Sequence, residues 1–100
     1  MDLNWRERVK PEFATMLPSF LQNLAMESAR LAGLLERSDF DALARIGHNF
    51  KGSAGYFGLA ELGEIACALE IYARAGDASR TADTIREWQT LLRRMELTPR

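Results

Sequence analysis

The chain of 100 residues contains only one cysteine, one histidine and three prolines, and its formal net charge is -1 at pH 7. A lone cysteine allows no internal disulfide, so we expect a reducing compartment, the cytoplasm. The near-neutral charge creates no field that would select nucleic acid or an anionic membrane. The sequence has no apolar run of about eighteen residues and no apolar signal-peptide core at residues 1–6, so we expect no membrane insertion.

Motifs for metal, nucleotide and nucleic-acid binding are also missing. One histidine and one cysteine without a Cys-x-x-Cys or His-Glu-x-x-His pattern do not predict a metal site. The glycine-rich residues 52–58 lack the Gly-Lys-Ser/Thr order of a P-loop, which excludes an ATP site of that kind. The arginines are balanced by scattered carboxylates, which we expect on the surface, and they form no basic stripe.

Apolar residues recur at helical spacing along most of the chain, and no segment alternates at the period of a strand. Hydrophobic residues make up 47% of the sequence, which suits one globular domain over residues 1–100. The pattern predicts helices at 12–37, 40–57, 60–74 and 78–97, joined by short turns. Short turns force antiparallel neighbours, so we predict an all-α, up-down-up-down four-helix bundle with a short extra helix in residues 2–10.

Turn and breaker residues mark the boundaries of these helices. Pro18 lacks an N–H group, so we expect the first helix to kink or split near Met16. The pair Ser38-Asp39 predicts a stop followed by an N-cap. Gly58 predicts the end of the second helix. Both tryptophans, Trp5 and Trp88, are assigned to packing. Met16 and Met26 are assigned to the core, with an exposed docking role as the alternative.

The second predicted helix has two opposite faces. At about 100° per residue, five of its apolar residues form one stripe opposite His48; they are Leu43, Ile46, Phe50, Ala54 and Phe57. Asp41, Ala44, Lys51, Gly52 and Gly55 share the face of His48 instead. This arrangement predicts a surface histidine among small residues flanked by charged ones.

His48 and its neighbours indicate a nucleophile that another protein approaches. An imidazole is mostly neutral near pH 7, and its free nitrogen can form a covalent intermediate. Lys51 lies one turn away, within reach of a phosphoryl group on the ring. Gly52 and Gly55 would leave the ring clear for a docking protein, with tight helix packing as the alternative. Gly47 lies nearer the apolar stripe and is assigned to packing.

The pattern His48-x-x-Lys51-Gly52-Ser53-x-Gly55-x-x-Gly58, followed by a leucine-rich helix ending near Leu69-Glu70, resembles the signature of histidine-containing phosphotransfer (HPt) domains. The resemblance covers the length, the four helices and the place of the motif in the second helix. It implies that His48 is the phosphoacceptor, that Lys51 stabilises the phosphate and that Gly52 provides clearance. Gly55 is added from its helical angle.

The resemblance implies a phosphorelay intermediate without an ATP site or independent turnover. His48 would accept a phosphoryl group from a receiver-domain phosphoaspartate and pass it to another receiver. The implied partners are response-regulator receiver domains, with a hybrid sensor histidine kinase as a further candidate. We expect a monomer without a cofactor, since Mg²⁺ would be bound by the receiver. The docking floor would include Ala44, Gly52, Gly55 and Leu59.

The sequence also allows a different function. The chain could be a helical adaptor in which His48 is incidental and partners use another face. Two settings also fit the chain, a free-standing protein and one domain of a larger sensor.

Overall fold

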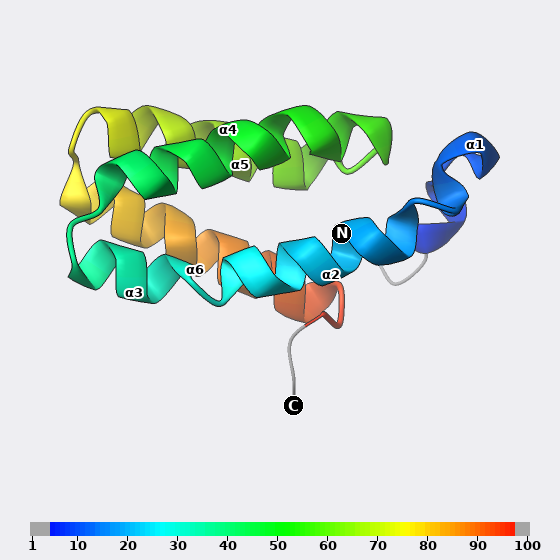
Figure 1. The fold of residues 1–100 in the computed structure, drawn as a ribbon, viewed down its shortest axis with the longest axis horizontal. Helices are drawn as coiled ribbons and strands as arrows, with labels where there is room; N and C mark the ends of the chain where they lie inside the picture. Colours follow the sequence, from blue (N-terminus) through cyan, green and yellow to red (C-terminus); the bar gives the residue numbers. More distant parts are fainter. Residues whose placement is uncertain (1–4, 98–100) are drawn as a thin grey trace.

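The computed structural model describes residues 5–97, and within that range all regular structure is helical. The elements are η1 (Trp5–Arg8), α1 (Pro11–Ala14), α2 (Leu17–Ser28), α3 (Leu31–Glu36), α4 (Phe40–Tyr56), α5 (Ala60–Arg74) and α6 (Ala78–Arg94). The helices α2 and α3 run in succession along one side, and α4, α5 and α6 complete an antiparallel bundle (Figure 1). The predicted all-α four-helix bundle is therefore confirmed.

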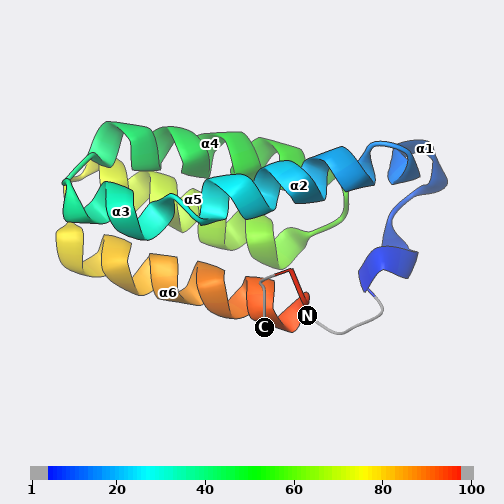
Figure 2. The same cartoon turned by 60° about the horizontal axis from the view of Figure 1, so that its bottom comes forward.

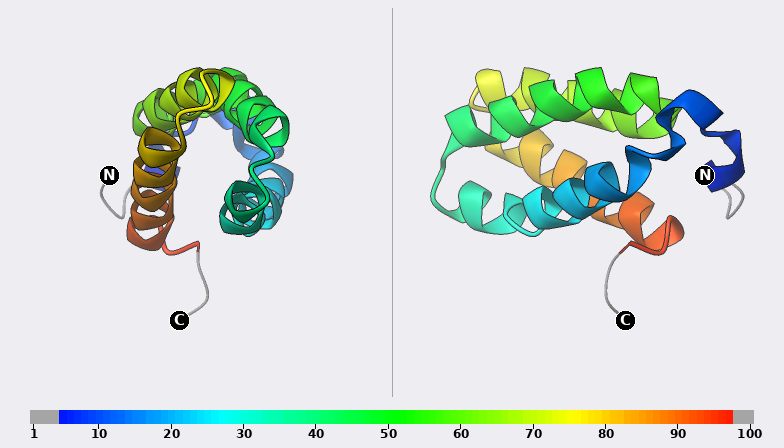
Figure 3. Two further views of the ribbon diagram at one scale, coloured as in Figure 1. Left: turned by 90° about the vertical axis from the view of Figure 1, so that its left-hand side faces the viewer. Right: turned by 45° about the vertical axis from the view of Figure 1, so that its right-hand side comes forward.

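An end view shows α4 and α5 side by side, with α6 on one side of them and α2 and α3 on the other (Figure 3). α5 contacts α4 on one side and α6 on the other, and α3 contacts both α4 and α6. Residues 2–4 of the predicted short N-terminal helix lie outside the described residues. Within residues 5–97, no helix is both long enough and apolar enough to cross a membrane.

The first predicted helix, 12–37, is broken at two places rather than one. The first break is confirmed near Met16, whose N–H donates to the Phe13 carbonyl at 3.0 Å in a tight turn, while Pro18 occupies the first turn of α2. The second break, at residues 29–30, was not predicted. There the Ser28 hydroxyl donates to the Leu24 carbonyl at 2.5 Å. Such a bond bends helices because the hydroxyl competes with the backbone. α3 nevertheless continues along the same side of the bundle (Figure 2).

The predicted stops between helices are confirmed by their backbone geometry. Ser38 has a φ of 55°, and the Asp39 carboxylate accepts a hydrogen bond from the Ala42 N–H at 3.1 Å. Gly58 has a φ of 67° after α4, and the next residue, Leu59, donates its N–H back to the Ala54 carbonyl at 3.0 Å. Glycine suits that position because it has no Cβ to clash in the left-handed region.

Aromatic side chains connect three helices through the core. The rings of Phe20 and Phe57 stack with centroids 4.5 Å apart, and Phe50 meets Trp88 edge-on at 5.7 Å. The Trp88 indole N–H donates to the Ser28 hydroxyl at 2.8 Å. The predicted apolar stripe of α4 lies in this core in full; it comprises Leu43, Ile46, Phe50, Ala54 and Phe57.

The assignment of Met16 and Met26 to the core is wrong. The two side chains are 56% and 62% exposed, respectively. Met16 lies in the turn that precedes α2, and Met26 lies about 120° around α2 from the buried Phe20. The alternative that placed them on the surface is the one that agrees with the structure.

The N-terminal segment packs on the end of the bundle where α4 terminates (Figure 1). Trp5 and Val9 are buried there, which confirms the assignment of Trp5 to packing. The Phe13 ring of α1 meets Tyr56 edge-on at 5.8 Å and Phe57 at 6.2 Å. Residues 5–14 therefore belong to the folded domain and hold the last turn of α4.

The helices α4 and α5 approach each other closely at Gly47. A Cβ atom at this position would lie 2.7 Å from both the Ala66 carbonyl oxygen and the Glu70 nitrogen. Both are backbone atoms, so neither can rotate away. The prediction that Gly47 serves packing is confirmed. Gly52 and Gly55 differ, since a Cβ at either would meet nothing within 4 Å.

The two kinds of glycine predict opposite effects of the same substitution. We expect Gly47→Ala to lower the free energy of unfolding by about 3 kcal/mol, the upper end of the usual cost of overpacking. We expect Gly52→Ala to raise it by about 0.8 kcal/mol, because alanine favours an exposed helix interior and the space is open. Urea unfolding of both variants measures this. If the two substitutions change the free energy of unfolding in the same direction, the assignment of Gly47 to helix packing is contradicted.

Candidate functional site

The helix α4 directs His48 away from the core. The side chain is 61% exposed, and Lys51 follows one turn later at 41% exposure. The expected surface histidine is therefore present, with its core stripe on the opposite face of the helix. The exposed backbone of Gly52 lies beside it.

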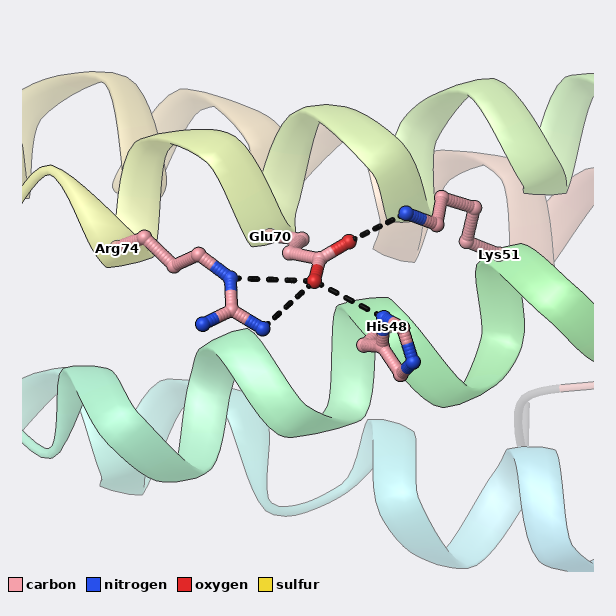
Figure 4. A network of polar contacts seen from close by, with 4 residues as sticks. All are labelled: His48, Lys51, Glu70 and Arg74. Atoms are coloured by element: carbon pink, nitrogen blue, oxygen red, sulfur yellow. Dashed lines mark hydrogen bonds and ion pairs between the residues drawn. The ribbon is translucent and has the colours of Figure 1, made fainter.

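A carboxylate from the neighbouring helix joins the two residues. Glu70 of α5 is only 10% exposed at its side chain and points between α4 and α5 (Figure 4). Its Oε2 lies 3.0 Å from His48 Nδ1, and its Oε1 accepts a hydrogen bond from Lys51 Nζ at 2.7 Å. Arg74, one turn further along α5, donates from Nε and Nη2 to Oε2 at 3.1 and 2.8 Å. One carboxylate thus holds three basic side chains.

These contacts shift the pKa values of Glu70 and Lys51 in opposite directions. The hydrogen bond from Lys51, followed by those from Arg74, lowers the pKa of Glu70 from 4.5 to about 2, although burial acts in the opposite direction. The same hydrogen bond raises the pKa of Lys51. Glu70 is therefore an anion and Lys51 a cation across the neutral range.

The ionised carboxylate fixes the tautomer of the neutral histidine. A carboxylate only accepts hydrogen bonds, so the proton of a neutral His48 ring must sit on Nδ1. The unprotonated nitrogen is then Nε2, which points away from Glu70 (Figure 4). The arrangement leaves a nucleophilic lone pair directed outward from a ring held on its other side.

The predicted docking floor is only partly at the surface. Gly52 and Gly55 are exposed, as expected. Ala44 is 4% exposed and lies in a hollow of about 270 Å³ that Asp41, Arg45, His48 and Arg74 also line. Leu59, the residue that precedes α5, is 1% exposed, so its expected contact with a partner is wrong.

Sequence reasoning missed Glu70 and Arg74. The carboxylates were expected on the surface, and Glu70 was noted only as the end of a leucine-rich helix. Two signals pointed to it. Glu70 continues the row of Leu62 and Ala66 at four-residue spacing, which places it on a buried edge of α5. Arg74 follows it at the spacing of a helical ion pair.

The model of the family described as Hpt domain matches residues 15–97. The chain belongs to the Hpt domain family. No curated protein and no solved structure matches this Hpt domain. The family implies histidine phosphotransfer in phosphorelays. Hpt domains interact with receiver domains and kinases in these relays.

The low pKa of Glu70 predicts a pH-dependent contribution to the stability of this Hpt domain. A carboxyl group whose pKa is depressed on folding stabilises the fold above its unfolded pKa, and this contribution is lost as pH falls through the folded pKa. We therefore expect the difference in unfolding free energy between wild type and Glu70→Gln to be constant near neutral pH. It should shrink between about pH 4.5 and about pH 2. Urea unfolding across that range tests it, and a difference that stays constant would contradict an ionised Glu70.

Proposed function

We propose that His48 accepts a phosphoryl group from the phosphoaspartate of a receiver domain and passes it to a second receiver. The observation that supports this most directly is the contact between His48 Nδ1 and the ionised Glu70, at 3.0 Å. It orients an exposed ring with Nε2 outward, within the motif of an Hpt domain. The protein contributes positioning rather than a separate acid or base.

The proposed transfer needs no proton movement on this chain. The Nε2 lone pair forms a bond to phosphorus while the bond between phosphorus and the aspartyl oxygen breaks. The aspartate leaves as a carboxylate with the electron pair. The ring keeps its Nδ1 proton and gains positive charge, which the Glu70 carboxylate stabilises across 3.0 Å. Transfer to the second receiver is the same step in reverse.

Lys51 is bound to Glu70 before transfer, so its proposed role requires it to move. A phosphoryl group on Nε2 would bring new negative charge to the face that Lys51 shares. The lysine side chain is half-exposed and flexible enough to turn from Glu70 towards it. Arg74 donates two hydrogen bonds to Glu70 and would keep the carboxylate in place after Lys51 leaves.

The receiver would supply the aspartate and the Mg²⁺ ion that its own phosphoryl chemistry uses, and this chain would supply no cofactor. We further propose that the domain acts as a monomer in the cytoplasm. A hybrid sensor histidine kinase remains a candidate for the protein that carries the donor receiver.

Labelling tests the phosphoacceptor directly. Receiver domains charged with radiolabelled acetyl phosphate are mixed with the wild-type chain and with His48→Gln. We expect acid-labile, base-stable label on the wild type and none on the variant, since a histidine N–P bond has that stability and an acyl phosphate does not. Equal labelling of both chains would favour the adaptor reading.

Lys51→Ala tests the role of the lysine, and Lys10→Ala is its control because Lys10 is an exposed lysine outside the matched residues. One charge pair near a solvated surface is worth about 1 kcal/mol, so we expect Lys51→Ala to slow transfer or shorten the lifetime of the phosphoprotein by about fivefold. Lys10→Ala should leave both quantities unchanged. If Lys51→Ala changes neither, Lys51 does not stabilise the phosphoryl group.

A further inference from the structure

The polar hollow of about 270 Å³ beside His48 lies towards the start of α4. Three exposed residues of α4 line it, namely Asp41, Arg45 and His48, and Arg74 lines it from α5. The remaining lining residue, Ala44, is only 4% exposed. Because His48 itself lines the hollow, a receiver that reaches the His48 ring also lies next to the hollow.

Arg45 brings a positive charge to the hollow that no contact within residues 5–97 neutralises. Its side chain is exposed, and it makes no hydrogen bond or ion pair with a described residue. Arg45 lies one helical turn before His48, so the Cβ atoms of the two residues are about 5–6 Å apart. A guanidinium group can form two parallel hydrogen bonds with one carboxylate. Arg45 is therefore placed to bind an anionic group that arrives together with the receiver.

Arg74 adds a second guanidinium group whose donors are only partly used. Its Nε and Nη2 donate to Glu70, whereas its Nη1 points away from Glu70 (Figure 4). The side chain of Arg74 is 63% exposed. Arg45, Lys51 and Arg74 outnumber the two anions around His48, which are Asp41 and Glu70. The surface around the ring is therefore positive overall.

A receiver brings the opposite charge to this surface. Proteins hold Mg²⁺ at phosphoryl-transfer sites through carboxylates and the phosphoryl oxygens. A receiver with a phosphoaspartate and Mg²⁺ therefore presents acidic side chains around the group that it transfers. Complementary charges across an interface speed up association and help to select the partner. Asp41 limits the match to one carboxylate, because a second carboxylate in the hollow would face its negative charge.

Building on the proposed function, we infer that the receiver places one acidic side chain in this hollow, where Arg45 binds its carboxylate through paired hydrogen bonds. The Nη1 group of Arg74 provides a second positive charge from α5. Arg45 then fixes the orientation of the receiver over His48 without touching the reacting atoms. It also selects among receivers, because a receiver with a basic side chain at that place is repelled.

Substitutions at Arg45 test this contact through the affinity for the receiver. The probe is the receiver that labels the wild-type chain, activated with beryllofluoride, which mimics the phosphoryl group and cannot be transferred. We expect Arg45→Gln to raise the Kd measured by calorimetry about tenfold, a usual loss for a hydrogen bond between charged groups. Arg45→Glu should raise it further, and Arg45→Lys should restore part of the affinity. Arg86→Glu is the matched control and should bind normally, because Arg86 is an exposed arginine of α6 that does not line the hollow.

Salt dependence and transfer kinetics separate this recognition contact from a structural role of Arg45. The ratio of the Kd values of Arg45→Gln and wild type should fall as NaCl rises from about 0.05 M to about 0.5 M, because salt screens exposed charge pairs. The transfer rate at saturating charged receiver should stay near the wild-type value, since Arg45 does not touch the reacting atoms. A ratio that is independent of salt would contradict the ion pair.

The remaining outcomes separate this inference from the proposed function. If the wild type is labelled but Arg45→Glu binds the receiver normally, or Arg86→Glu weakens binding equally, the hollow does not hold a receiver side chain. If inorganic phosphate binds the wild type and not Arg45→Gln, while both bind the receiver equally, the hollow holds a free anion and the inference is overturned. Absence of label on the wild type would instead overturn the proposed function. Should Arg45→Glu unfold, Arg45→Gln decides, since it removes the charge of an exposed side chain without adding one.

Discussion

The burial of one carboxylate, Glu70, constrains the whole functional face. A charged group this far from water is stable only if donors replace its hydration. The donors come from two helices, His48 and Lys51 from α4 and Arg74 from α5. They can meet because Gly47 lets the two backbones approach beside Glu70 itself. The packing of α4 against α5 and the orientation of the His48 ring therefore depend on the same contacts. A change in the spacing of the two helices would alter both.

The sequence was sufficient to predict the two faces of the second helix. The periodicity of residues 40–57 separated His48 from the core stripe, and it also separated Gly47 from Gly52. Features that depend on contacts between helices were not predictable in this way. Glu70 meets His48 across 22 positions of sequence, and Trp88 meets Ser28 across 60. Glu70 was expected on the surface because it is charged, although its spacing from Leu62 and Ala66 indicates a buried edge of α5. Nothing in the apolar spacing of residues 12–37 indicated the break that follows Ser28.

α4 also shows two opposite uses of the same residue type. Gly47 is required by its neighbours, since any side chain there would collide with the backbone of α5. Gly52 and Gly55 are required by nothing within the described chain, yet each weakens the helix by about 1 kcal/mol relative to alanine. Residues that reduce stability without a structural reason are typical of functional surfaces. The proposed docking of a receiver gives these two positions their reason.

The contact of Phe13 with Tyr56 and Phe57 has a consequence for how the domain can be moved between proteins. The residues matched to the family begin at residue 15, but the folded unit begins earlier, with Trp5, Val9 and Phe13 packed on the end of the bundle. A fusion joined at the family boundary would keep His48 and its carboxylate. It would nevertheless remove the ring that supports the end of α4, so the natural cutting point for recombination lies before Trp5.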